Sequence, residues 1–94
     1  MDEIVILGIK DPEAEIVEIP REIDGKPVTV LDGGCFTNCR EYLRKVILPD
    51  TIKEIGDYAF AYCEKLEKPI IPVSVTKIGE NIFANCSFEK ESRS

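Results

Sequence analysis

Four cysteines carry the most reactive chemistry in the chain: Cys35, Cys39, Cys63 and Cys86. Thiols can form disulfides, ligate a soft metal or act as nucleophiles. However, Cys35-x-x-x-Cys39 is not a zinc-binding spacing, the chain has no histidine, and no base is evident beside a cysteine. A cysteine that recurs in an apolar segment is usually a small buried hydrophobe. We therefore predict buried free thiols, and no metal site, cofactor or catalytic residue.

Three of the cysteines end a segment that occurs three times. Each copy closes with Phe-x-x-Cys, and Phe60 lies 24 residues after Phe36 and 23 residues before Phe83. Self-similarity at a fixed period of this length is typical of repeat architectures, in which a single unit cannot bury its own apolar side. Stacking the units in register would place the phenylalanines in one column and the cysteines in another.

Each unit contains a short segment that we interpret as a strand ending in proline, which has no N–H to continue a ladder. The three segments are Val17–Pro20, Val46–Pro49 and Pro69–Pro72. After each final proline come two apolar residues three positions apart. Because proline is normally confined to the edge of a sheet, we expect the strand with Pro69 to be the last one. The first unit has an insertion whose Asp24-Gly25 step indicates a loop.

The N-terminal region is rich in β-branched residues at 2–10 and again at 15–20, and we expect two strands that form a hairpin over one end of the core. The predicted fold is a repeat solenoid, mostly β with short helical or 3-10 turns. We expect one domain at 1–86, with the N-terminal cap and first strand at 1–20 and the repeats at 21–86, followed by a polar tail at 87–94.

The composition is acidic and excludes several classes of partner. The net charge is −6, and residues 1–20 hold six acidic residues against one lysine. Without a basic stripe, nucleic acid and anionic membrane surfaces are not expected partners. No apolar run approaches the roughly 18–20 residues of a membrane span, so we expect no membrane insertion. The acidic start Met1-Asp2-Glu3 does not read as a signal peptide.

The repeated pattern resembles BspA-type leucine-rich repeat proteins over roughly residues 14–86. The residues that carry the resemblance are Ile19-Pro20-x-x-Ile23-Asp24-Gly25-Lys26-Pro27-Val28-Thr29, then Leu43-x-x-Val46-x-Leu48-Pro49-x-x-Ile52-x-x-Ile55-Gly56-x-x-Ala59-Phe60-x-x-Cys63, and a weaker copy from Leu66 to Cys86. The resemblance implies a right-handed solenoid with a parallel sheet on its concave side. It also implies a non-enzymatic role, commonly binding partner proteins at a cell surface or outside the cell.

Alternation along the strands predicts which side chains point out of this sheet. Val46 and Leu48 point inward, so their neighbours face solvent, with Ile47 beside Ile70 and Lys45 beside Lys68. The predicted protein-binding residues are Ile16, Glu18, Lys45, Ile47, Lys68 and Ile70. The alternative is that these are isolated exposed isoleucines, which are common. The alternative function is that of a structural element with no dedicated ligand site, either a capped repeat remnant or a repeat that stacks with a copy of itself, because so few units leave large open ends.

Overall fold

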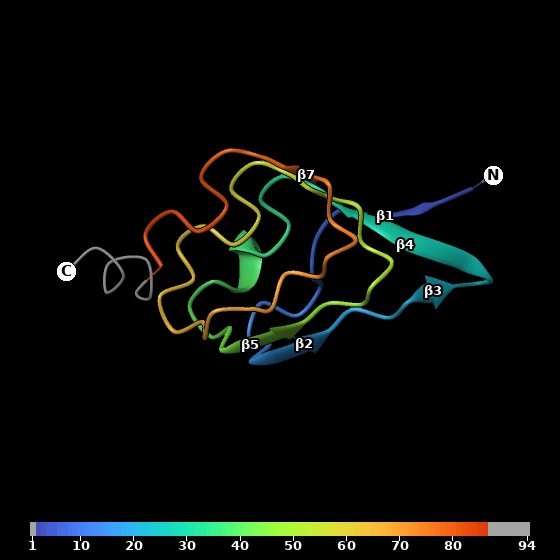
Figure 1. The fold of residues 1–94 in the computed structure, drawn as a ribbon. Coiled ribbons are helices and arrows are strands. Elements are labelled where there is room, and N and C mark those ends of the chain that lie inside the picture. Colours follow the sequence, from blue (N-terminus) through green and yellow to red (C-terminus); the bar gives the residue numbers. More distant parts are fainter. Residues whose placement is uncertain (1, 87–94) are drawn as a thin grey trace.

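The computed structural model describes residues 2–86, and most of its regular elements are short β-strands. The elements are β1 (Ile4–Ile6), β2 (Ile16–Glu18), β3 (Glu22–Ile23), β4 (Lys26–Leu31), the 3-10 helix Thr37–Cys39, β5 (Lys45–Ile47), β6 (Glu54–Ile55) and β7 (Lys77–Ile78). Figure 1 shows the chain winding in stacked coils, with β2 and β5 on one side and β1, β4 and β7 on the other. The polar tail predicted at 87–94 lies outside the described residues.

Two parallel sheets hold neighbouring coils together. The larger has the order β1-β4-β6-β7, and in it Leu31 pairs with Ile55, which in turn pairs with Ile78. The smaller joins β2 to β5, with Val17 opposite Val46. Partners in the larger sheet lie one sequence period apart, so each coil adds one rung to it. The molecule is therefore a repeat solenoid built mainly from strands.

Three strands of the larger sheet, β4, β6 and β7, come after the prolines and were not among the predicted strands, whereas β1 lies in the strand predicted at 2–10. Strands β6 and β7 have two residues each. The apolar residues that precede and end β6, Ile52 and Ile55, are both fully buried but stand three positions apart. A strand is recognised in a sequence by alternation of apolar and polar residues over four or more positions. The spacing of Ile52 and Ile55 therefore gave no indication of β6.

The expected N-terminal hairpin is wrong, because the first two strands lie in different sheets. β1 pairs in parallel with β4, and β2 pairs in parallel with β5. Ile4 and Ile6 of β1 are half-buried and pack against the core cluster. Parallel pairing with β4 lets these side chains extend the apolar interior by one rung, which a hairpin with β2 would not do.

The strand expected at Pro69–Pro72 is also absent from the described residues. The amide of Glu67 donates to the carbonyl of Arg44 at 2.8 Å, which begins a ladder with the preceding coil. No further backbone hydrogen bond to β5 follows along this segment, in which Pro69 occupies the buried position that Val46 holds one coil earlier. The smaller sheet thus ends at β5, while β7 follows later in the chain in the other sheet, which contradicts the expectation that Pro69 marks the last strand.

The core contains the two predicted columns. The rings of Phe36 and Phe60 stack with centroids 4.9 Å apart, and those of Phe60 and Phe83 with centroids 5.4 Å apart. The thiol of Cys86 donates to the carbonyl of Phe60 at 3.1 Å, so a cysteine links its own coil to the preceding one. The predicted stacking of the three units in register is confirmed.

The insertion in the first unit folds as a β-hairpin. β3 pairs antiparallel with the start of β4, and Ile23 lies opposite Lys26. The two turn residues, Asp24 and Gly25, have φ of 53° and 78°. This is the conformation that an Asp-Gly step favours in two-residue hairpins, so the predicted turn is confirmed and its flanking strands were missed.

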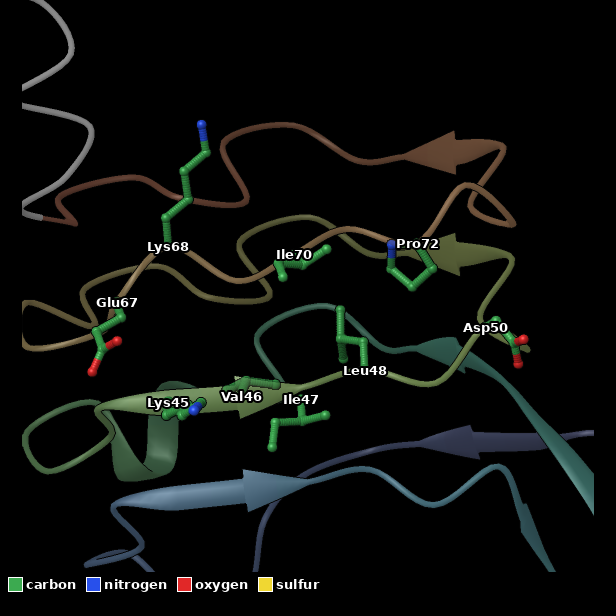
Figure 2. A pocket seen from close by; sticks show the side chains of 9 residues that line it. All are labelled: Lys45, Val46, Ile47, Leu48, Asp50, Glu67, Lys68, Ile70 and Pro72. Atoms are coloured by element: carbon green, nitrogen blue, oxygen red, sulfur yellow. The ribbon is translucent and has the colours of Figure 1, made fainter.

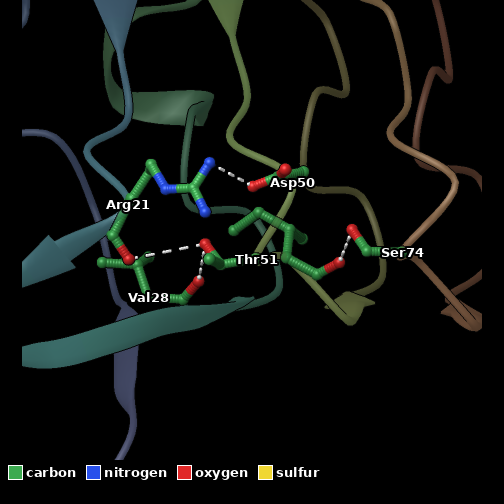
Figure 3. Close-up of polar contacts among 6 residues, drawn as sticks. Arg21, Val28, Asp50, Thr51 and Ser74 are labelled. Atoms are coloured by element: carbon green, nitrogen blue, oxygen red, sulfur yellow. Dashed lines mark hydrogen bonds and ion pairs between the residues drawn. The ribbon is translucent and has the colours of Figure 1, made fainter.

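Hydroxyl groups support the turns that connect the two sheets, as Figure 3 shows. Thr51 Oγ1 donates to the carbonyl of Val28 at 2.8 Å, and one coil later Ser74 Oγ donates to the carbonyl of Ile52 at 2.7 Å. Beside them, Arg21 Nη1 lies 2.6 Å from the carboxylate of Asp50. The two hydroxyl bonds thus join neighbouring coils through the carbonyls of Val28 and Ile52.

Candidate functional site

The six predicted binding residues alternate with buried ones along three adjacent coils. In β5 the side chain of Val46 is 5% exposed, whereas that of Ile47 is 42% exposed. In β2, Ile16 and Glu18 are exposed on either side of the half-buried Val17. Lys68 and Ile70 are likewise exposed on either side of a buried residue, Pro69. The structure places all six side chains on the outer surface of these coils.

Strand register brings the predicted residues into rows across the coils. Ile16 of β2 lies opposite Lys45 of β5, and Glu18 lies opposite Ile47. The next coil contributes Lys68 and Ile70, although it is not a strand there.

A groove of about 410 Å³ lies between β5 and the segment 67–72. Nine residues line it: Lys45, Val46, Ile47, Leu48, Asp50, Glu67, Lys68, Ile70 and Pro72. Figure 2 shows Lys45, Lys68 and Glu67 at one end, the two isoleucines in the middle, and Asp50 with Pro72 at the other end. The groove therefore has a charged end and an apolar centre.

Four of the six predicted residues line this groove, and two do not. Lys45, Ile47, Lys68 and Ile70 are part of its lining, whereas Ile16 and Glu18 lie on the other side of β5. The prediction missed the other five lining residues, which are Val46, Leu48, Asp50, Glu67 and Pro72. Pro72 could have been predicted. It occupies the position of Pro49 in the preceding unit, and it continues the alternation of Lys68 and Ile70 along the segment.

The open edge of β5 explains why a groove forms here. On the side of β2, the amide of Lys45 donates to the carbonyl of Glu15 and the amide of Ile19 donates to the carbonyl of Ile47. On the other side, within the described chain, the ladder begins with Glu67 and goes no further. No further backbone hydrogen bond joins the two segments in the described chain, so they are not tied together along the groove.

The charges at the two ends of the groove differ in how they are neutralised. Asp50 forms an ion pair with Arg21. Neither Lys45 nor Lys68 has an ion-pair partner among residues 2–86. The lysine end therefore presents two ammonium groups that form no ion pair within the described chain.

The four cysteines are buried as free thiols, as predicted. Burial raises the pKa of Cys35 and of Cys63 to about 12 and also raises the pKa of Cys39. The thiolate is the nucleophile and the metal ligand, so these groups are inert at neutral pH. Within residues 2–86, no cluster of three or more acidic or cysteine side chains is arranged to hold a metal ion.

No helix in the described part of the chain is both long enough and apolar enough to span a bilayer.

Comparison with known proteins gives a family and no individual relative. A family model described as "BspA type Leucine rich repeat region (6 copies)" matches residues 16–92. No curated protein and no solved structure shows a significant match to the chain. The matched range includes β2, β5 and every residue that lines the groove.

Proposed function

Because the chain belongs to the BspA-type leucine-rich repeat family, we propose that it is a non-enzymatic module that binds a partner protein through the groove beside β5. Leucine-rich repeat domains generally mediate protein interactions, and solenoids use their extended strand surfaces for this purpose. The observation that carries the proposal is the pair of exposed isoleucines, Ile47 and Ile70, at the centre of a groove on that surface.

The apolar area at this site is small but concentrated. Ile47 is 42% exposed and Ile70 is 87% exposed, and Leu48 and Pro72 extend the apolar surface toward the Asp50 end. Burying a large aliphatic side chain contributes about 1.5–3 kcal/mol, so two such anchors are enough for a specific, moderate contact. A partner that inserts one or two apolar side chains fits this description better than one that needs a broad flat interface.

The proposal includes the geometry expected for the solenoid. The coils wind in a right-handed sense, and the face that contains β2 and β5 is the concave side. Residues 1–86 act as one domain in which the N-terminal segment 1–20 caps the first repeat. Support for the cap comes from Ile4, Ile6 and Ile9, which pack against the core cluster at that end.

Selection from a phage-displayed library of random twelve-residue peptides tests the proposed function. Clones selected on the wild-type chain should lose binding to the variant Ile47→Asp/Ile70→Asp. They should keep it with the control Leu7→Asp/Val73→Asp, which adds the same charge at side chains that are 73% and 101% exposed. Clones that bind both variants equally, or an absence of enriched clones, would contradict the proposal.

A second candidate function is self-association through the end of the solenoid that contains β7. Ile78 is 53% exposed there, and among the described strands β7 has one partner, β6. An unpaired strand edge with an exposed aliphatic side chain favours pairing with another chain. Sedimentation equilibrium between micromolar and millimolar concentration tests this candidate, and a constant monomer mass over that range would exclude it.

A further inference from the structure

We propose that the groove beside β5 recognises an extended peptide in which an acidic side chain stands two residues from a large apolar one. This inference rests on the proposed function, because it names the chemistry of the partner at the same groove. It follows from the order of the lining residues, from the charges that have no partner, and from the shape of the apolar centre.

The lining residues form two rows separated by two positions along the chain. The first row holds Lys45 and Lys68, and the second holds Ile47 and Ile70. Two residues of extended chain span roughly 6.5–7 Å, and side chains at i and i+2 project from the same face. An extended peptide presents its own i and i+2 side chains to the groove at this same spacing. One side chain can therefore meet the lysine row while the other meets the isoleucine row.

The charge at the lysine end matches one carboxylate. Lys45 and Lys68 have no ion-pair partner among the described residues, and Glu67 lies at the same end. Together these three groups carry one net positive charge in a chain whose net charge is −6. Because the rest of the chain repels acidic ligands, this end is a local site where a single acidic side chain is favoured.

The opposite end of the groove offers no comparable attraction for charge. Asp50 there is already paired with Arg21 at 2.6 Å, and its neighbour across the groove is Pro72. The centre between the two ends is formed by isoleucines whose side chains face outward (Figure 2). A peptide reading acidic-x-apolar, in the direction from the lysine row to the isoleucine row, matches the lysine end and the apolar centre.

Four capped nine-residue peptides, labelled with fluorescein and flanked by Gly-Ser, test the inference by fluorescence polarisation. The first has the core Glu-Ser-Leu, the second Lys-Ser-Leu, the third Glu-Ser-Ser, and the fourth Glu-Leu without the spacer. We expect Glu-Ser-Leu to bind at least tenfold more tightly than each of the others at low salt. Its affinity should fall as ionic strength rises, since surface charge pairs are screened.

Charge reversal in the protein supplies the matched control. The variant Lys45→Glu/Lys68→Glu should lose affinity for Glu-Ser-Leu by at least tenfold and gain affinity for Lys-Ser-Leu. The variant Lys53→Glu/Lys77→Glu makes the same change of charge at exposed lysines outside the groove and should leave both affinities within about twofold.

The outcomes separate this inference from the proposed function. If leucine peptides bind through Ile47 and Ile70 regardless of the charge two residues away, the acidic requirement is overturned and the binding groove stands. If the four peptides fail while clones from the random library still bind at the two isoleucines, the inference alone falls. If neither the peptides nor any library clone binds there, both proposals fall.

Discussion

The ring of Phe60 stacks on that of Phe36 with an interplanar angle of 9°, although the two residues come from different coils. The ring of Phe83 continues the column on the other side of Phe60 at an interplanar angle of 20°. Phe60 is fully buried, whereas Phe83 is half-buried at the end of the column. The phenylalanine column thus fixes the register of the stacked repeats, and its middle member, Phe60, contacts both neighbouring rings.

Truncation of the middle ring should therefore cost more than truncation of the terminal one. We expect Phe60→Ala to lower the free energy of unfolding by about 3–5 kcal/mol, because it removes apolar contacts and leaves a cavity between two rings. Phe83→Ala should cost less than half as much. Urea denaturation followed by circular dichroism measures both, and equal losses would show that the column is not the registering element.

Gly56 should tolerate no side chain, because adjacent coils approach closely at that point. A Cβ on Gly56 would lie 2.5 Å from the backbone nitrogen of Gly33. We expect Gly56→Ala to lower the free energy of unfolding by about 1–3 kcal/mol or more through overpacking. Gly8→Ala is the matched control, since the nearest atom to a Cβ there is 3.9 Å away. A neutral Gly56→Ala variant in the same denaturation assay would contradict the close approach of the coils.

Tyr62 occupies a backbone conformation that suits asparagine better. Its φ is 66°, and one coil later the equivalent position is Asn85, with φ of 61°. A left-handed conformation costs a residue with a bulky side chain about 1 kcal/mol more than it costs asparagine or glycine. Tyr62→Asn should therefore raise the free energy of unfolding by about 0.5–1 kcal/mol.

The control for this substitution is Tyr42→Asn. Tyr42 is similarly exposed, is absent from the set of residues with positive φ, and has Lys65 Nζ 5.9 Å from its ring centroid. It should lose stability slightly or remain unchanged. A thermal melt that ranks Tyr42→Asn above Tyr62→Asn would argue against relief of strain as the cause.

The buried thiols make stability fall at alkaline pH. Burial raises the pKa of Cys35 and Cys63 from 9.0 to about 12 in the folded chain. Between those values the unfolded chain has already released protons that the folded chain retains, so the free energy of unfolding falls by up to about 1.4 kcal/mol per pH unit for each thiol. Below pH 9 this contribution is constant.

Comparison of the wild type with a cysteine variant separates the effect of the thiols on stability from the effect of lysine and tyrosine titration. Urea denaturation from pH 7.5 to 10.5 should show a shallower decline for Cys35→Ala/Cys63→Ala than for the wild type. A thiol reagent should also react only slowly with the native chain, since buried structural thiols are inert. Once urea unfolds the chain, the reagent should react with all four cysteines. Parallel pH profiles for the two proteins would refute the linkage.

Much of the fold could be predicted because large apolar core residues mark the sequence period of the repeat. Phe36, Phe60 and Phe83 announce the number of units and their register, and the alternation around Val46 identifies the strand that borders the groove. Each of these sequence patterns lies within one unit and recurs in the others, so an ambiguous assignment in one unit can be resolved by comparison with the next.

The parts that could not be predicted depend on geometry between coils. β6 and β7 are too short to show alternation, and they are strands only because neighbouring coils lie at hydrogen-bonding distance. The groove lies where the backbone bonding beside β5 stops after Glu67, so residues such as Asp50 and Glu67 line it through the path of the backbone rather than through any pattern of their own. The positions of Lys45, Ile47, Lys68 and Ile70 followed from alternation alone.

The β3–β4 hairpin bears on how the chain finds its fold. Ile23 pairs with Lys26 across two residues, whereas every other strand pair in the described chain joins positions 23 to 29 residues apart. Short loops close fastest, so this hairpin should form first, on the microsecond scale of isolated hairpins. Each later coil then closes a loop of similar length onto an edge already in place. The folding rate should accordingly be sensitive to changes at Asp24 and Gly25, neither of which lines the proposed binding groove.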